Sequence, residues 1–93
     1  MIKSFRCKDT ERVFRGQAAK RFPQNLLKRA KMRLDRIDAA FVLDDLRVPP
    51  SHHLEVLQGD RLGQLSIRIN DQWRICFAWS DGSAHAVEIV DYH

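Results

Sequence analysis

Alternation of apolar and polar residues in the last third of the chain constrains the fold more than any other sequence feature. Segments 65–69, 73–79 and 87–90 each place apolar side chains at every second position. This period of two is typical of strands that bury one face. Asp81-Gly82 separates the second and third segments, and this dipeptide favours a short hairpin. We therefore expect three strands in an antiparallel meander.

The first forty residues favour helices instead. A set of apolar residues recurs at spacings of three and four, as on the buried face of an amphipathic helix: Leu27, Ala30, Leu34 and Ile37. We expect this helix to have Pro23 as its first residue and to end near residue 39 or 40. A shorter helix, capped by Asp9 or Thr10 and ending near Gly16, is expected before it.

Two further segments complete the expected organisation. Residues 2–6 alternate apolar with polar side chains and predict a short strand that adds to an edge of the sheet. Residues 44–53 form a loop, because Pro49 and Pro50 exclude regular helix there. This order predicts one α+β domain over residues 1–93, with two N-terminal helices packed on an antiparallel sheet of about four strands.

Charge is divided unevenly along the chain. Sixteen Lys and Arg residues outnumber twelve acidic residues, so the formal net charge is +4. Residues 1–36 carry twelve of the basic residues and three acids, a net charge of +9, whereas residues 37–93 have a net charge of −5. A basic half of this kind suits a polyanion such as RNA, and it equally suits an ordinary solvated helix surface.

Several other classes of protein are disfavoured by the sequence. The longest fully apolar run, residues 75–79, is far shorter than the ~18 residues of a membrane helix. Residues 1–6 interleave charged and apolar side chains, unlike a secretory signal. Cys7 and Cys76 do not form a metal-binding spacing. We therefore expect a cytoplasmic protein with no membrane contact, no metal and no cofactor.

Polar residues gather where the expected strands end. Asp91, Tyr92 and His93 follow the third apolar segment, and Arg68 and Arg74 belong to the neighbouring strands. Phosphodiester transfer in RNA needs a base, a cation beside the crowded phosphorane and an acid, and these residue types supply all three. On these grounds alone a frayed tail and ordinary outward-facing arginines are the commoner case, and both interpretations stay open.

Three motifs of the C-terminal half occur together in one known family. They are Gly59-Asp60-Arg61, Asn70-Asp71-Gln72-Trp73-Arg74-Ile75 and the closing Asp91-Tyr92-His93. With the opening residues 1–5, they resemble the HigB toxins of bacterial toxin–antitoxin systems, which belong to the RelE/ParE superfamily. The resemblance covers nearly the whole chain and is most specific from Leu54 onward.

That resemblance implies a RelE/ParE-like fold and a ribosome-dependent endoribonuclease that cuts translated mRNA and arrests growth. It also implies neutralisation by a helix-turn-helix antitoxin of the HigA type, with operator DNA bound only through that antitoxin. Two alternatives stay open: a ParE-like inhibitor of DNA gyrase, and a non-catalytic binding module of the same fold.

Individual residues also acquire roles from the resemblance. Asp91, Tyr92 and His93 match the family's active-site tail, as groups that transfer protons or orient the substrate. Arg74 matches a strand arginine that stabilises the phosphate. An RNA target favours a functional basic face, for which the candidates are Lys28, Arg29, Lys31, Arg33, Arg61 and Arg68.

One stretch departs from the family pattern. Some members read His-Pro-Leu-Lys before Gly-Asp-Arg, whereas this chain has Glu55 in place of the His and Gln58 in place of the Lys. His53 lies two residues earlier and, in an extended segment, would point to the same side as Glu55. We expect Glu55 or His53 to fill the catalytic role of that histidine, or the enzyme to be weaker than its relatives.

Overall fold

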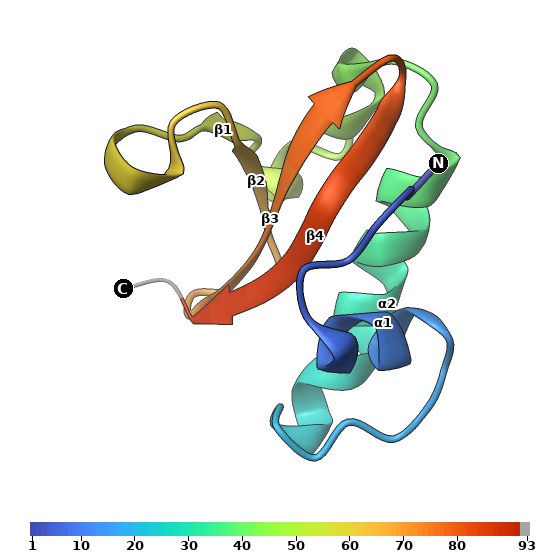
Figure 1. Cartoon of the computed structure of the whole chain (residues 1–93). Helices are drawn as coiled ribbons and strands as arrows, with labels where there is room; N and C mark the ends of the chain where they lie inside the picture. Colours follow the sequence, from blue (N-terminus) through green and yellow to red (C-terminus); the bar gives the residue numbers. More distant parts are fainter. Residues whose placement is uncertain (92–93) are drawn as a thin grey trace.

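The computed structural model describes residues 1–91, which form two helices packed against a four-stranded sheet (Figure 1). Every neighbouring pair of strands is antiparallel, in the order β1-β2-β3-β4. The helices are α1 (Lys8–Phe14) and α2 (Gln24–Ala39), and the strands are β1 (Glu55–Val56), β2 (Leu65–Arg68), β3 (Trp73–Ser80) and β4 (Ser83–Asp91). This arrangement confirms the expected α+β class.

The meander of the last three strands is confirmed, and its tightest connection follows the expected turn chemistry. Asp81 and Gly82 link β3 to β4 with φ angles of +53° and +74°. Two consecutive positive φ values match a two-residue turn whose twist suits the flanking strands. Asp81 tolerates this conformation because its short polar side chain costs less there than a branched one.

The expected strand over residues 2–6 is wrong, because this segment makes only two isolated parallel bridges to β4. Ile2 pairs with Ala84, and Phe5 pairs with Val87. Between them β4 is bulged: Ala86 has a φ of +52°, and its N–H donates to the Ser4 hydroxyl at 2.9 Å. The bulge interrupts a regular ladder, so the fourth strand is β1, on the opposite edge of the sheet.

The N-cap of helix α1 lies two residues before Asp9 and three before Thr10, so neither predicted capping residue lies at the helix start. Cys7 occupies the N-cap position, while Asp9 and Thr10 lie inside the helix. Thr10 is fully buried, and its hydroxyl accepts a hydrogen bond at 3.0 Å from the backbone N–H of Ile89 in β4. That bond ties α1 to the sheet. The left-handed Gly16 (φ +74°) follows the helix end, as expected of a glycine there.

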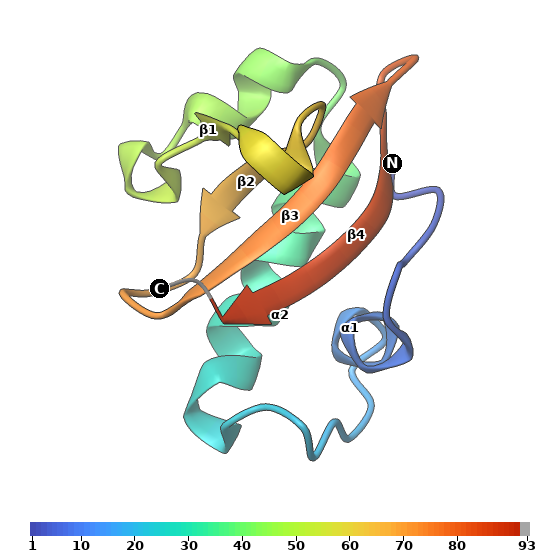
Figure 2. The ribbon, with the colours of Figure 1, turned by 60° about the vertical axis from the view of Figure 1, so that its left-hand side comes forward.

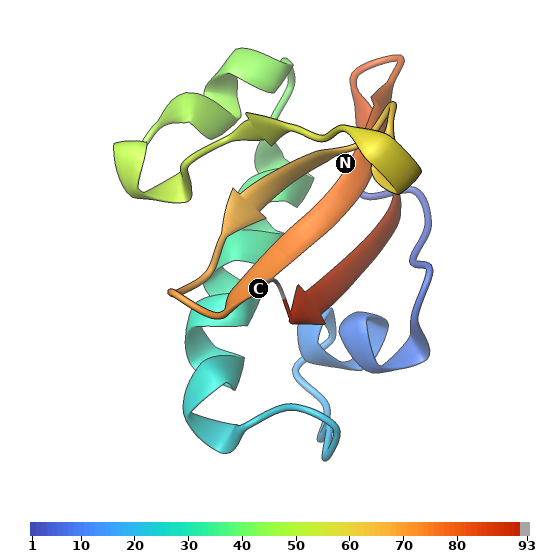
Figure 3. The same cartoon turned by 90° about the vertical axis from the view of Figure 1, so that its left-hand side faces the viewer.

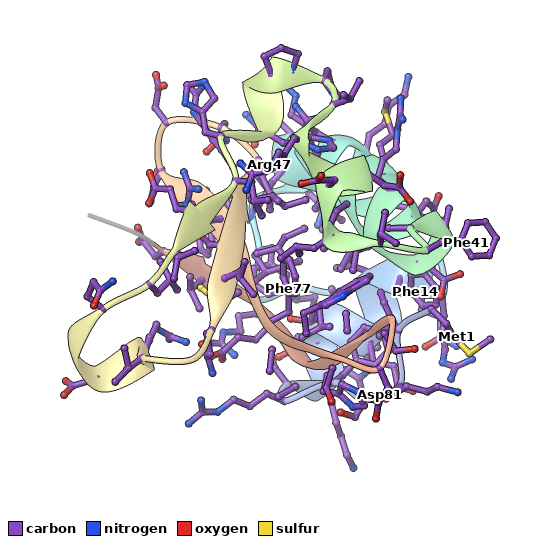
Figure 4. All side chains as sticks on the ribbon, turned by 90° about the horizontal axis from the view of Figure 1, so that it is seen from above. Met1, Phe14, Phe41, Arg47, Phe77 and Asp81 are labelled. Carbon is purple, nitrogen blue, oxygen red and sulfur yellow. The ribbon has the colours of Figure 1, made fainter. Side chains whose placement is uncertain are left out.

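Helix α2 lies across one face of the sheet (Figure 2). It ends at Ala39 as predicted, although Pro23 is its N-cap rather than its first residue. Its buried side chains are those of Leu26, Ala30, Leu34 and Ile37. Leu26 thus takes the place expected for Leu27. Phe77 of β3, fully buried, lies inside the molecule, whereas Phe41 projects from the outer surface (Figure 4).

The segment from residue 53 to residue 64 covers the other face of the sheet (Figure 3). It begins at the β1 edge, and its short 3-10 helix η3 (Gly59–Arg61) reaches across to β4. There, Arg61 Nη1 lies 2.8 Å from Glu88 Oε1. Because the segment crosses β3, Cys76 is buried on a face that would otherwise meet solvent.

The expected loop between α2 and β1 contains two 3-10 helices, η1 (Leu43–Arg47) and η2 (Pro50–His52). Both are too short to be regular α-helix, in line with the effect of the two prolines. Among residues 1–91, no helix is long and apolar enough to cross a membrane.

Candidate functional site

Arg74 is the centre of the candidate site, on the face of the sheet opposite α2. It is only 7 % exposed. Its Nε donates to the Ser66 hydroxyl at 2.8 Å, and its Nη2 donates to the His53 carbonyl oxygen at 2.6 Å and to the Ser66 carbonyl oxygen at 3.3 Å. These oxygens hold the guanidinium in one orientation. Arg74 is therefore not an ordinary outward-facing arginine.

Strand β1 brings Glu55 to this arginine. The Glu55 carboxylate lies 3.9 Å from Arg74 Nη2 and is half exposed, so it is open to solvent and to a ligand. Glu55 also pairs in register with Ser66, the residue that holds Arg74. The short β1 pairing thus places a carboxylate beside the buried cation, where the departure from the family pattern occurs.

His53 joins the site through its backbone rather than through its imidazole. Its carbonyl oxygen accepts a hydrogen bond from Arg74, while its side chain is exposed. The expectation of an extended segment from His53 to Glu55 is wrong, because His53 is left-handed (φ +45°, ψ +58°) as the C-cap of η2. Side chains two residues apart point to the same side only in an extended strand, and His53 is not extended. Its spacing from Glu55 therefore does not determine the direction of its imidazole ring.

Arg68 lies directly across the ladder from Arg74 and therefore on the same face. Its guanidinium forms an ion pair with Asp71 in the turn after β2. The structure thus brings two of the predicted arginines together at the end of the sheet. Such a pair is electrostatically unfavourable by itself and is stabilised by nearby carboxylates or by a bound anion.

Asp91 closes β4 opposite Trp73, which places it on the helix-facing side of the sheet. It is exposed, and its carboxylate accepts a hydrogen bond from Gln72 Nε2 at 3.1 Å. Asp91 and Arg74 therefore leave opposite faces of the sheet at the same end of it. The other two predicted tail residues, Tyr92 and His93, lie outside the described residues.

The exposed part of α2 carries cations on two sides. On the side nearer β2, Arg33 lies among Arg29, Arg36 and Arg68; we call these four residues the arginine cluster. Burial lowers the pKa of Arg33, and repulsion from its three neighbours lowers it further. Arg29 Nη1 approaches the Ile69 carbonyl oxygen at 3.5 Å, and Arg33 Nη2 donates to the Ser51 hydroxyl at 3.4 Å. The cluster therefore adjoins the end of the sheet that carries Arg74.

Lys28 and Lys31 occupy the other side of α2, toward α1. Lys31 forms an ion pair with Asp35 at 3.0 Å, and its Nζ lies 5.5 Å from the centre of the Phe14 ring in α1. Arg61 is the remaining candidate for RNA binding. It lies in η3, on the face of the sheet opposite α2, and pairs with Glu88 of β4. The six predicted RNA-binding residues thus do not form one surface.

Ser66 is the site residue that sequence reasoning missed. It is fully buried and adds nothing to the pattern of apolar alternation, because it occupies an outward position of β2. The available signal was weak: a small hydroxyl residue two positions before Arg68 on the same face. Only the crossing segment, which removes this face from water, makes its hydroxyl a partner for Arg74.

Chemically, the site offers a preorganised cation and a solvent-accessible carboxylate next to it. A cation fixed before the substrate arrives stabilises developing negative charge without reorganising in the transition state. Within residues 1–91, no group of three or more His, Cys, Asp or Glu side chains is arranged to hold a metal ion. Burial raises the pKa of the Cys76 thiol beneath the crossing segment, which keeps that thiol protonated and unreactive.

Comparisons with known proteins bear on the family and the fold of the chain. Residues 3–93 match the family model described as the RelE-like toxin of type II toxin–antitoxin system HigB. The chain is 36 % identical over 85 residues to Toxin HigB-1 of Vibrio cholerae, covering 90 % of each chain. It is 34 % identical over 93 residues to Endoribonuclease HigB of Proteus vulgaris, covering all of both chains.

Among solved structures, the YoeB–YefM complex from Staphylococcus aureus contains a chain of the same fold. The TM-score is 0.62 at 16 % identity, covering 100 % of this chain and 98 % of that one. The two-helix, four-strand architecture thus recurs in a distant toxin–antitoxin protein. With the family match over residues 3–93, these similarities show that the chain belongs to the HigB family of RelE-like toxins from type II toxin–antitoxin systems.

Proposed function

We propose that this toxin is an endoribonuclease that cuts translated mRNA on the ribosome, with Arg74 binding the scissile phosphate. The observation that carries the proposal is the fixed Arg74 guanidinium, only 7 % exposed and held by Ser66 and the His53 carbonyl. A surface arginine needs no such support, whereas an arginine that must meet a phosphorane in one orientation does. The endoribonuclease named among its relatives supports the same activity.

In the proposed reaction, a base removes the proton of the ribose 2′-hydroxyl, and its oxygen attacks the adjacent phosphorus. The P–O bond to the 5′ oxygen then breaks, and an acid protonates that leaving oxygen. Glu55 is our candidate for one proton-transfer role, because its carboxylate lies 3.9 Å from Arg74 and is half exposed. Asp91, Tyr92, His93 and the side chain of His53 are the other candidates.

The proposed partners follow from the family and from the distribution of charge. The arginine cluster adjoins the Arg74 end of the sheet and would contact mRNA or ribosomal RNA. A HigA-type helix-turn-helix antitoxin would neutralise the toxin, and operator DNA would be bound only through it. With this substrate and these partners, the toxin would act in the cytoplasm, where ribosomes translate the message.

Arg74→Ala tests the proposal directly. We expect cleavage of ribosome-bound message to fall by about 100-fold or more, as when an enzyme loses one charge-stabilising group. Ser66→Ala should give an intermediate loss with a lower kcat, because Arg74 remains but loses the hydroxyl that orients it. Arg47→Ala is the matched control, because Arg47 is exposed and forms its ion pair with Asp44 within η1. Message 5′ ends mapped after brief induction provide the measurement.

Wild-type cleavage by Arg74→Ala would overturn the site. Intact message together with gyrase trapped on DNA would instead support the ParE-like alternative. The roles of Glu55 and His53 are tested by alanine at each position, singly and together, in a growth assay. Unchanged toxicity of the double variant would exclude both residues from proton transfer.

A further inference from the structure

A groove of about 320 Å³ opens between α1 and α2. Its apolar lining comes from Val13 at the end of α1 and from Leu27 and Met32 of α2. Gly16 lines its edge, and a Cβ added there would meet no atom within 4 Å. The groove is therefore open where α1 ends and the chain turns back toward α2.

Met32 is the exposed apolar side chain of this groove. It is 60 % exposed, although α2 has a fully buried apolar face elsewhere. A second hollow of about 360 Å³ lies on its other side, lined by Lys28 and by Arg29 and Arg33 of the arginine cluster. An exposed, adaptable methionine between two hollows is typical of a surface that packs against another protein.

The charge around the groove is entirely positive. Lys28 and Lys31 line it, and none of its lining residues is acidic. Among residues 1–91, Lys28 has no ion-pair partner, and Lys31 has only Asp35 on the next turn. The groove therefore complements an apolar segment flanked by carboxylates, because Lys28 would gain a partner and Lys31 a second one.

We propose that the α1–α2 groove binds an amphipathic acidic segment of the antitoxin. Apolar side chains of that segment would cover Met32 and Leu27, and its Asp or Glu residues would pair with Lys28 and Lys31. RNA fits less well, since a phosphate backbone gains nothing from an apolar floor. A second copy of the toxin fits less well too, because this surface repels itself electrostatically. The proposal rests on membership in a toxin–antitoxin family and not on the nuclease site.

Met32→Glu tests the groove with a single charge. The probe is the purified antitoxin expressed from the toxin's own operon, titrated calorimetrically into the full-length toxin. We expect Kd to rise by about tenfold or more, because the new carboxylate would be buried among apolar groups of the bound segment and beside its carboxylates. Lys28→Glu should weaken binding in the same direction, and Met32→Leu should preserve it.

Phe41→Glu is the matched control, since Phe41 is 85 % exposed, follows the C-terminal end of α2 and lines neither hollow beside Met32. It makes the same change in charge and should leave Kd unaltered. Binding of Met32→Glu within twofold of wild type would overturn the proposal. So would a loss of ribosome binding or of self-association by Met32→Glu without a change in antitoxin affinity. Because the readout is antitoxin binding, it is independent of whether the toxin cleaves RNA.

Discussion

At the scale of single residues, hydrogen bonds of buried polar groups fix how the strands and α1 are arranged. Arg74, Ser66 and Thr10 are all buried, and each is hydrogen-bonded to another element of the fold. A buried polar group that loses its partner costs about 1–3 kcal/mol, so these bonds specify one arrangement of strands and helix. The bonds that orient Arg74 also join β3 to β2 and to the segment at His53, so the fold itself positions the proposed phosphate-binding group.

His52 is the buried residue with the clearest consequence for stability. Its Nδ1 lies 3.0 Å from the Leu46 carbonyl oxygen, which assigns Nδ1 as the protonated nitrogen of the neutral ring. Burial lowers the pKa of His52; the Leu46 carbonyl opposes this shift, and the charges of Arg33 and Arg36 add to it. The unfolded chain, with a pKa near 6.5, therefore binds a proton more readily than the folded one.

We predict that the toxin loses stability as the pH falls below 6.5, because protons then favour the unfolded state. His52→Asn keeps a donor toward Leu46 and has no titrating ring. It should be less stable than wild type at pH 7.5 but should show a smaller drop in Tm between pH 7 and pH 5. Differential scanning calorimetry over this pH range measures this, and equal drops in Tm would contradict the assignment.

At the scale of elements, the β3–β4 hairpin combines a favourable turn with a strained bulge. Gly82 has the positive φ that its turn requires, and a Cβ there would lie 3.3 Å from the Phe41 carbonyl oxygen. Ala86 has a similar positive φ without being glycine. An L-residue in this region costs about 1–2 kcal/mol, so the bulge that receives the N-terminal segment is held at a cost in stability.

We predict that replacing Ala86 by glycine stabilises the protein and that replacing Gly82 by alanine destabilises it. Ala86→Gly should raise the free energy of unfolding by up to about 1 kcal/mol, because glycine removes the Cβ clash. Gly82→Ala should lower it by about 1 kcal/mol or more, through strain and the close approach to Phe41. Urea unfolding of both variants gives the values. Destabilisation by Ala86→Gly would mean that the bulge is not strained.

At the scale of the whole molecule, the strongly basic first third is not one surface. Helix α2 contributes three residues of the arginine cluster, Arg29, Arg33 and Arg36, and Lys28 and Lys31 line the groove toward α1. The first group adjoins the proposed phosphate site, and the second flanks an apolar groove. Five of the twelve basic residues of segment 1–36 therefore lie on α2, in two groups that we expect to meet different partners.

Salt dependence distinguishes the two surfaces. We predict that Arg29→Gln with Arg33→Gln lowers the slope of log K for ribosome binding against log salt by about one for each phosphate that the toxin no longer neutralises. Lys28→Gln with Lys31→Gln removes the same charge and should leave that slope nearly unchanged. Cosedimentation with ribosomes over a range of salt concentrations measures both. Equal slopes for the two double variants would contradict the prediction that the arginines of α2 contact ribosomal RNA and the lysines do not.

Most of the architecture could be predicted from local sequence patterns. Periodicity located α2 and the three strands of the meander, and Asp81-Gly82 located their tightest turn, because these signals depend on neighbouring residues only. The strand over residues 2–6 and the caps of α1 were mispredicted. Both depend on β4, which lies more than 70 residues away in the sequence. Backbone N–H groups of β4 donate hydrogen bonds to the hydroxyls of Ser4 and Thr10.

The chemistry-bearing residues were visible in the sequence, and their environment was not. The motif around Arg74 and the carboxylate at Glu55 are local patterns, and the family resemblance found in this half of the chain is confirmed. Burial of Arg74, its bond to Ser66 and the left-handed His53 arise only when residues 53–64 cross the sheet. The amino-acid sequence determines which residue types are present and at what spacing. The burial of a side chain and its distance from its partners depend on which distant segments come together, and this is decided in the tertiary structure.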